Sequence, residues 1–314
     1  MKTKRLGSSG VEVSSMCLGA MYFGSRNDRT LSYRILDRYL GAGGTFIDTA
    51  NIYAWWVEGF HGGESETLLG EWMRERGNRQ RVFLASKVGF QYGDVPKRLT
   101  SALIIQECEK SLKRLGVETI DLYYAHVDDR LTPLEESFEA FDHLVRSGKV
   151  RFIGASNYSA WRLEEARWIS AINGWPQFCA LQQHYTYLRL RPGMDLAPQS
   201  FATDSELDYL RTHDLAFLAY SVLQSGGYTR TDRPLRKEYG GSDNAERLNV
   251  LHAVAAELGA PVNQVILAWM MQANPPAIPL IAASSEAQLD ENLGALSLIL
   301  TPEQLNRLTT AGTH

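Results

Sequence analysis

The sequence is poor in cysteine and carries no excess of basic charge. Its 314 residues include three cysteines, and 32 Lys and Arg against 36 Asp and Glu give a net charge of −4. Cys17, Cys108 and Cys179 lie far apart without metal-ligand spacing, which predicts reduced thiols in a cytoplasmic protein and no metal site. Nothing in this charge balance indicates a nucleic acid or an anionic membrane as a partner.

Long apolar segments are also missing. No stretch approaches the ~18 consecutive apolar residues of a membrane span, and no apolar core follows the charged residues Met1 to Arg5, so we expect no signal peptide. There is no linker and no low-complexity segment. With 44% hydrophobic residues the chain can bury a large core. We therefore expect a single domain over residues 1–314.

What the chain does contain is a regular alternation of short apolar segments and longer amphipathic ones. A hairpin with its turn at Leu6 to Gly10 is expected first. The expected strands are Ser15–Leu18, Thr45–Ile47, Val82–Ser86, Thr119–Ala125, Val150–Ala155, Cys179–His184, Ala216–Tyr220 and Ala277–Ile281. Each is followed by a helical pattern, which predicts parallel pairing with helical crossovers.

Eight such strands can close into a barrel filled by side chains. The predicted fold class is α/β, a (β/α)8 TIM barrel with an N-terminal β-hairpin and an extra C-terminal helix beginning near Thr301. An open doubly wound sheet is the alternative, and it needs a G-x-G-x-x-G turn after its first strand. The glycine-rich stretch Leu40 to Gly44 follows a helix instead, which argues against the open sheet.

Polar residues stand at the ends of six consecutive predicted strands. They are Asp48, Lys87, His126, Ser156 with Asn157, Gln182, and Tyr220 with Ser221. Barrel enzymes build their active sites from the carboxyl ends of the strands. We therefore expect these side chains to converge on one rim.

The residue types at this rim suit proton transfer to a carbonyl oxygen. Tyr53 is a phenol with an ordinary pKa of ~10, and an ammonium at Lys87 is expected to lower that pKa. Asp48 can hold Lys87 in place, and His126 can orient a substrate oxygen. Because no side chain supplies a hydride, reduction of the carbonyl also requires a cofactor. The amides of Asn157 and Gln182 suit the carboxamide of a nicotinamide.

Seven motifs in a fixed order make the chain similar to the aldo-keto reductases from end to end. They are "LGSSGVEVSSMCLGAMYFG", "FIDTANIY", "LASK", "DLYYAH", "SGKVRFIGASN", "QQHY" and "AYSVLQSG". The resemblance implies a catalytic tetrad of Asp48, Tyr53, Lys87 and His126, with Tyr53 as general acid in reduction and base in oxidation.

The same resemblance implies a set of cofactor-binding residues. Ser156, Asn157 and Gln182 would hold the carboxamide, Tyr220 would stack on the nicotinamide, and Ser221 and Leu223 would approach the pyrophosphate. The set also includes Gly19, Ser284, Gln288 and Asn292. The implied partner is a small carbonyl or alcohol substrate, and the oligomeric state is not predicted.

Two segments depart from the family pattern. The stretch Ala54 to Gly62 is longer than usual and contains Trp55 and Trp56. We expect these indoles to wall the substrate pocket together with Tyr22 and Phe23, which suits an aromatic substrate or the apolar face of a sugar. The alternative is that they only pack the loop.

The second departure is the segment Pro279 to Asn292, which has no Lys or Arg to pair with a 2′-phosphate. Ser284, Gln288 and Asn292 can still donate hydrogen bonds there, at a predicted helix N-terminus that favours phosphate. NADP(H) is the predicted cofactor, and NAD(H) is the alternative.

Other functions remain open from the sequence. Lys87 could serve a Schiff-base aldolase, although a neighbouring Asp48 would keep it protonated. His126 with Asp128 and Asp129 could serve a metal hydrolase, although no paired-histidine motif accompanies them. A non-catalytic nicotinamide-binding regulatory subunit is the third alternative, and the intact set of four residues argues against it.

Overall fold

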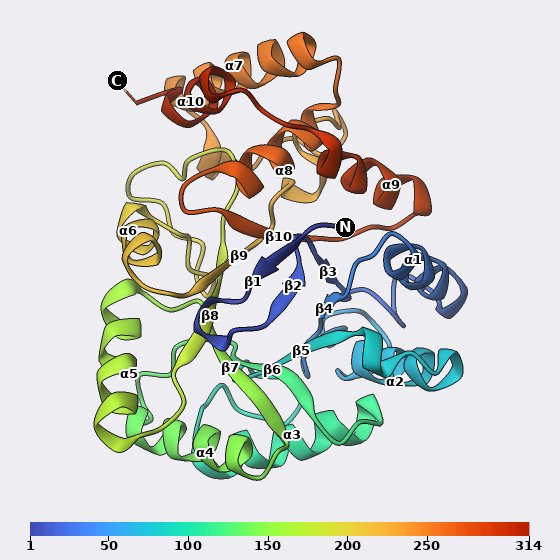
Figure 1. Cartoon of the computed structure of the whole chain (residues 1–314), viewed down its shortest axis with the longest axis vertical. Helices are drawn as coiled ribbons and strands as arrows, with labels where there is room; N and C mark the ends of the chain where they lie inside the picture. The colour runs from blue at the N-terminus through green and yellow to red at the C-terminus, as the bar shows by residue number, and fades with distance from the viewer. Residues whose placement is uncertain (314) are drawn as a thin grey trace.

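A computed structural model describes residues 1–313 and places a closed barrel of parallel strands at its centre (Figure 1). The strand order around the barrel is β10-β3-β4-β5-β6-β7-β8-β9. The barrel strands are β3 (Cys17–Gly19), β4 (Phe46–Asp48), β5 (Phe83–Val88), β6 (Ile120–Ala125), β7 (Val150–Ser156), β8 (Phe178–His184), β9 (Ala216–Tyr220) and β10 (Ala277–Ile281). The predicted barrel is confirmed, and no expected strand end lies more than two residues from the observed one.

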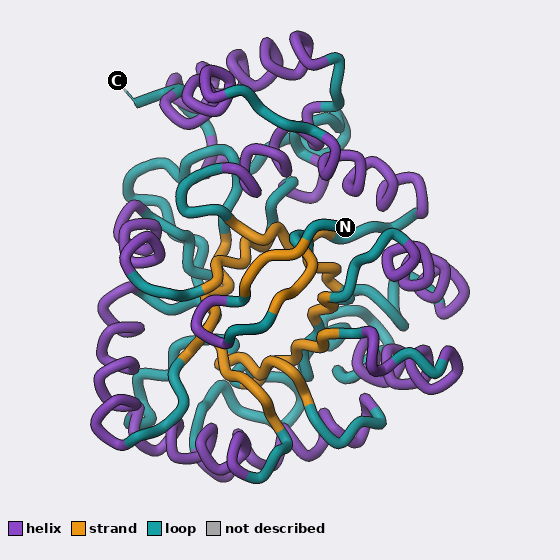
Figure 2. The backbone as a smooth tube through the Cα atoms, in the orientation of Figure 1, coloured by secondary structure: helices purple, strands orange, loops and turns teal. Residues whose placement is uncertain are grey.

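Helices surround the barrel on all sides (Figure 2). They are α1 (Arg29–Gly41), α2 (Glu64–Arg76), α3 (Ser101–Leu115), α4 (Leu134–Arg146), α5 (Ala160–Asn173), α6 (Asp204–Thr212), α7 (Ser242–Leu258), α8 (Val262–Gln272), α9 (Glu286–Gly294) and α10 (Pro302–Thr310). The expected C-terminal helix is α10. It begins with a capping box in which Thr301 and Gln304 each bond the other's backbone N–H.

The predicted hairpin consists of β1 (Thr3–Arg5) and β2 (Glu12–Ser14), which pair antiparallel. It lies across one end of the barrel (Figure 1). Leu6 and Val13 are fully buried there, in one cluster with the interior side chains of the barrel. At Gly7, whose φ is +49°, a Cβ atom would lie 2.2 Å from the carbonyl oxygen of Cys179, so this approach requires glycine. The hairpin therefore closes the end of the barrel at which the strands begin.

The alternation of side chains along each strand decides which residues reach the other end. In β4, Phe46 belongs to the barrel interior and Ile47 to the core between barrel and helices. Because side chains alternate with a period of two, Asp48 points inward like Phe46. Interior Ala85 and Tyr124 are likewise followed two residues later by Lys87 and His126. The strands thus deliver these polar groups to the open rim.

Within residues 1–313, no single helix is long and apolar enough to cross a membrane. Helices α7 and α8 pass the length and composition test only together, and they meet at a bend of 99°.

Candidate active site

Three neighbouring strands bring Asp48, Lys87 and His126 together at the carboxyl end of the barrel. Asp48 pairs with Ala85 of β5, and Lys87 pairs with Tyr124 of β6. The backbone N–H of His126 continues this ladder by donating to the carbonyl of Val88 at 2.8 Å. Since the pairing fixes the height of each residue in the barrel, the site is built on rigid strands.

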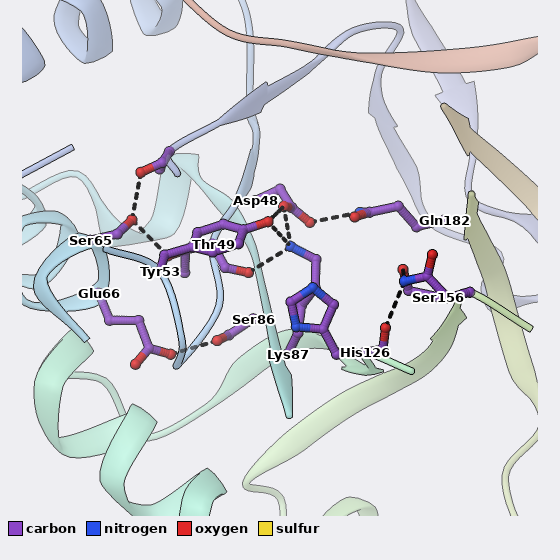
Figure 3. Close-up of polar contacts among 12 residues, drawn as sticks. Asp48, Thr49, Tyr53, Ser65, Glu66, Ser86, Lys87, His126, Ser156 and Gln182 are labelled. Carbon is purple, nitrogen blue, oxygen red and sulfur yellow. Dashed lines mark hydrogen bonds and ion pairs between the residues drawn. The ribbon is translucent and has the colours of Figure 1, made fainter. Parts of the chain in front are cut away.

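Lys87 is the centre of the buried cluster (Figure 3). Its Nζ atom donates to Asp48 Oδ1, to the Tyr53 hydroxyl at 2.7 Å and to the carbonyl oxygen of Thr49 at 2.9 Å. The Tyr53 hydroxyl also lies 3.4 Å from Asp48 Oδ1. Lys87 and Asp48 are fully buried, and Tyr53 is 7% exposed. The three acceptors use all three hydrogens of the ammonium group.

Tyr53 reaches the cluster from a tight turn after β4. The N–H of Tyr53 bonds to the carbonyl of Ala50 at 3.2 Å, and Ala54 adopts a φ of +81°, in the left-handed region. The start of the turn is fixed by the Thr49 hydroxyl, 2.7 Å from that of Ser65, which in turn donates to the carbonyl of Ala20. This backing holds the turn that presents the phenol.

The surroundings set the protonation of Tyr53 and Lys87. Lys87 was expected from the sequence to lower the pKa of Tyr53, but burial raises the pKa of this phenol, and the charge of Asp48 adds to the rise. Burial lowers the pKa of Lys87, while the contact with Asp48 opposes that effect. The proton therefore stays on Tyr53 at neutral pH, which is the state that a proton donor requires.

His126 is a neutral imidazole at the same rim. Burial, and secondarily the charge of Lys87, hold the pKa of His126 well below its ordinary value. Its ring contacts the edge of the Phe90 ring at a centroid distance of 4.6 Å and lies 6.1 Å from the ring of Tyr53. In the part of the chain that the structure describes, its Nδ1 atom has no hydrogen-bond partner. The ring thus keeps hydrogen-bonding capacity beside the phenol.

The amide side chains expected to hold a carboxamide lie at the next strands of the rim. Gln182 donates to Asp48 Oδ2 at 2.9 Å, and Asn157 donates to the carbonyl of His126 at 2.9 Å. Asn157 also donates to the Ser156 hydroxyl at 3.1 Å and accepts from the Tyr220 hydroxyl at 2.7 Å. The ring of Tyr220, which is partly exposed, is therefore fixed in place.

The segments expected near the rest of a cofactor adopt defined backbone shapes. Ser221 is exposed with a φ of +58°, and Leu223 is partly buried. Farther along, Gln224 and Ser225 also have positive φ. Turns of this kind direct backbone N–H groups to one side and can bind anions. Gly19, the last residue of β3, is buried and would place a Cβ atom 3.4 Å from the Leu280 side chain.

At the start of α9, hydrogen bonds organise the expected phosphate-binding residues. The backbone N–H and hydroxyl of Ser284 both donate to Gln288 Oε1, at 2.8 and 2.9 Å. Asn292 is buried and donates to the carbonyl of Ala282 at 3.2 Å, so it supports the backbone of this segment. The amide nitrogen of Gln288 is left on an exposed side chain at the helix start.

Of the four expected pocket aromatics, Trp56 is the one whose ring contacts that of Tyr53 in the described residues. Trp55 is 41% exposed and Trp56 is 45% exposed, and the Trp56 ring meets the Tyr53 ring edge-on at 6.1 Å. Tyr22 is partly exposed and carries the Arg26 guanidinium over its ring at 4.6 Å. Phe23 is only 1% exposed and packs in the core between barrel and helices. The expectation that Phe23 walls the pocket is therefore corrected.

Sequence reasoning missed the residues that support the site from behind. Glu66 is fully buried and accepts hydrogen bonds from Ser86 at 2.5 Å and from Arg114 at 2.6 Å. The sequence did contain a signal for Glu66, because it is the last residue of the motif "GESE" (Gly63 to Glu66) with which α2 begins. Phe90 had no such signal, since only the fold shows that its loop passes over His126.

Asp128 and Asp129 have structural partners. Asp128 forms ion pairs with Arg130 and Arg162, at 2.9 and 3.1 Å. Asp129 accepts from the Thr132 hydroxyl and from the backbone N–H of Leu99. Residues 1–313 contain no group of three or more His, Cys, Asp or Glu side chains arranged to hold a metal ion. These aspartates order the loop after β6.

The chain combines a closed (β/α)8 barrel with a buried set of Asp48, Tyr53, Lys87 and His126 at its rim. A family model described as "Aldo/keto reductase family" matches residues 15–312. The chain belongs to the aldo/keto reductase family, as the resemblance implied, and enzymes of this family use nicotinamide cofactors.

Individual relatives cover nearly the whole chain. The Bacillus subtilis protein named "Uncharacterized oxidoreductase YrpG" is 34% identical over 98% of this chain and 95% of its own length. An aryl-alcohol dehydrogenase [NADP(+)] from Phanerodontia chrysosporium is 29% identical over 95% of this chain and 82% of its own. The crystal structure of the thermostable aldo-keto reductase Tm1743 matches with a TM-score of 0.78 and 27% identity, over 99% of both chains.

Proposed function

We propose that this protein reduces an aldehyde or ketone to the alcohol with NADP(H), with Tyr53 as the proton donor, and catalyses the reverse reaction with Tyr53 as the base. One observation carries the proposal. The buried Nζ atom of Lys87 lies 2.7 Å from the Tyr53 hydroxyl while it is also bonded to Asp48. A phenolate formed at Tyr53 would therefore stand directly beside a cation, which is where stabilisation of the developing charge is required.

The protein groups divide the proton chemistry between them. A bound nicotinamide cofactor would supply the hydride to the carbonyl carbon. As the carbonyl π bond breaks, its electron pair stays on oxygen, which takes the proton from the Tyr53 hydroxyl. Lys87 stabilises the resulting phenolate, and Asp48 keeps Lys87 charged. The neutral ring of His126 can donate one hydrogen bond to the same oxygen and so orient the substrate.

The chemistry of the neighbouring side chains fits a nicotinamide. The Ser156 hydroxyl accepts from Asn157 and still has a proton to donate, and the amides of Asn157 and Gln182 are held in fixed orientations. A partly exposed tyrosine ring anchored through its hydroxyl, as at Tyr220, can stack on a flat heterocycle. The turn from Ser221 onward offers backbone N–H groups suited to a pyrophosphate.

Ion pairs between α1 and α9 support NADP(H) over NAD(H). Glu286 and Asp290 of α9 are acids near the expected position of a 2′-phosphate, and unpaired they would repel it. In the structure, Glu286 pairs with Arg34 at 3.0 Å and Asp290 pairs with Arg38. The pairing offsets the negative charge near the helix N-terminus, which itself favours phosphate. The NADP(+) in the name of the aryl-alcohol dehydrogenase relative points the same way.

The loop after Tyr53 favours an aromatic substrate. Trp56 places an indole that is 45% exposed against the ring of the proposed proton donor, and Phe90 contacts the ring of His126. Flat apolar groups beside the reacting residues suit a planar substrate. The relative named for an aryl alcohol agrees with this substrate class.

The hydrogen bonds of Lys87 argue against an aldolase. A Schiff base requires a neutral amine with a free lone pair, whereas Lys87 donates to three acceptors, one of which is a buried carboxylate. A regulatory subunit without catalysis has no need of this arrangement, although it could bind the same cofactor.

A substrate panel tests the proposal. Purified protein is mixed with NADPH or NADH and a series of aldehydes and ketones, and loss of the reduced cofactor is followed by its absorbance. We expect turnover with NADPH, fastest for aromatic aldehydes. Tight binding of NADPH without turnover of any carbonyl compound would instead support the regulatory subunit.

A further inference from the structure

A buried carboxylate outside the proposed catalytic set joins two loops of the rim. Glu107 on α3 is fully buried and accepts hydrogen bonds from three side chains. Asn51 and Lys110 donate to it at 2.8 Å each, and the Tyr92 hydroxyl donates to the same oxygen as Asn51. We call these four residues the Glu107 clamp. Hydrogen bonds from Lys110, Tyr92 and Asn51 outweigh burial and hold the pKa of Glu107 below its ordinary value, so the group is a carboxylate at neutral pH.

The first loop joined by the clamp carries the proposed proton donor and both indoles. Asn51 lies between Asp48 and Tyr53 in the chain, and its backbone N–H donates to the carbonyl of Lys87 at 3.3 Å. Its amide then reaches outward to Glu107. The clamp therefore holds the loop at a point between Asp48 and Tyr53.

The far end of the same loop returns to the clamp. At Gly62, whose φ is +90°, a Cβ atom would lie 2.8 Å from the Tyr92 ring and 3.2 Å from the carbonyl oxygen of Asn51. Tyr92 therefore packs over the base of the loop, where residues 51 and 62 meet. A loop closed at its base in this way loses much of its freedom, because its two ends cannot separate.

The second loop is the one that contains Tyr92 itself. It carries Phe90, which contacts His126, and Gly93, which lies beside Trp55: a Cβ atom at Gly93 would be 3.8 Å from the indole. Both loops thus carry aromatic side chains near the reacting residues, and both are bonded to Glu107.

We propose that the Glu107 clamp fixes the two loops as one unit. It thereby sets the distance between the aromatic side chains that would contact the substrate, Trp55 and Trp56 on the first loop and Phe90 on the second, which together we call the aromatic wall. Glu107 and Tyr92 are positioning residues in this account. They act through Asn51 on the Tyr53 loop and through the chain around Tyr92 on Phe90. The proposal rests on the proposed function, since it assigns the wall to the substrate of that reaction.

Two conservative variants test the clamp. Tyr92→Phe keeps the ring over Gly62 and removes only the hydroxyl, and Glu107→Gln keeps the shape and removes the charge. The matched control is Tyr209→Phe, which removes another tyrosine hydroxyl that donates to a glutamate, Glu164, at 3.0 Å on the outer helices. Each protein is studied as the full chain by hydrogen–deuterium exchange and by steady-state kinetics.

The expected result is local and depends on substrate size. In both clamp variants, amide exchange in residues 49–63 and 89–99 should quicken about fivefold or more, the order expected when a hydrogen bond to a charged group is lost. KM for 4-nitrobenzaldehyde should rise by a similar factor, while KM for propanal and kcat stay within about twofold. The control should match the wild type in both measurements.

Unchanged exchange in both loops, or an equal loss for both aldehydes, would overturn the proposal. Failure of the proposed function looks different, because the wild type would then turn over neither aldehyde. In that case the clamp has no effect on substrate binding to explain, and the exchange data alone decide whether it holds the two loops together.

Discussion

Truncation of Trp56 to alanine should weaken the binding of aromatic substrates specifically. The Trp56 side chain is 45% exposed and its ring meets that of Tyr53 edge-on. A large aromatic side chain has roughly 200 Å² of surface, so roughly 90 Å² of Trp56 is free to be covered by a ligand. At about 25 cal/mol per Å², covering half to nearly all of that area contributes about 1 to 2 kcal/mol.

This free energy corresponds to a rise of about five- to thirtyfold in KM for 4-nitrobenzaldehyde. Propanal, which is too small to reach across the indole, should change by less than about twofold, and the melting temperature should change little because the side chain is half exposed. The assay is steady-state kinetics on both aldehydes, with Trp161→Ala as the control for loss of an exposed indole on α5. An unchanged ratio of the two KM values, together with a much lower melting temperature, would mean that Trp56 packs the loop, and the reasoning would be refuted.

Three further predictions concern charge. Arg34→Ala leaves Glu286 unpaired at the start of α9. The free carboxylate should repel the 2′-phosphate, so KM for NADPH should rise about three- to fivefold while KM for NADH is unchanged. Equal effects on both KM values would mean that this ion pair does not support NADP(H) over NAD(H). Burial lowers the pKa of His184 from 6.5 to about 4, so the unfolded chain takes up a proton in this range that the folded protein does not. His184 alone should therefore account for about 3 kcal/mol of the unfolding free energy that wild type loses as the pH falls from 6.5 to 4. His184→Gln should lack that contribution in urea titrations, and parallel pH curves for the two proteins would contradict it. Borohydride added with a carbonyl substrate and no cofactor should leave the protein mass unchanged, whereas an adduct at Lys87 would favour the aldolase.

Much of the fold could be predicted because its signals are local. Each barrel strand is a short apolar segment followed by a helical pattern, and the count of eight indicates closure. The rim residues followed from the same signal, since a polar residue directly after a buried strand must emerge at its carboxyl end. Asp48, Lys87 and His126 were predicted on this basis, and the structure places them together with Tyr53.

What the sequence did not reveal depends on contacts between distant segments. Arg38 and Asp290 are 252 residues apart, and only the closure of the barrel between β10 and β3 brings α1 beside α9. Phe23 was expected at the pocket beside Tyr22, but its ring is buried in the core between barrel and helices. The pKa of Tyr53 was predicted in the wrong direction because the depth of burial cannot be read from residue spacing.

The most direct test of the account is single-turnover reduction of 4-nitrobenzaldehyde by wild type and Tyr53→Phe with NADPH. Tyr53 is the only group within the Lys87 cluster proposed to donate the proton, so its loss should lower the rate of the chemical step by about 10²- to 10⁴-fold. The dissociation constant for NADPH, measured by fluorescence, should stay within about twofold, because Tyr53 is not one of the expected cofactor-binding residues. Those residues lie at the end of β3, at or just after the ends of β7, β8 and β9, and in or just before α9. A Tyr53→Phe variant that reduces the aldehyde at the wild-type rate would contradict the assignment of the proton donor.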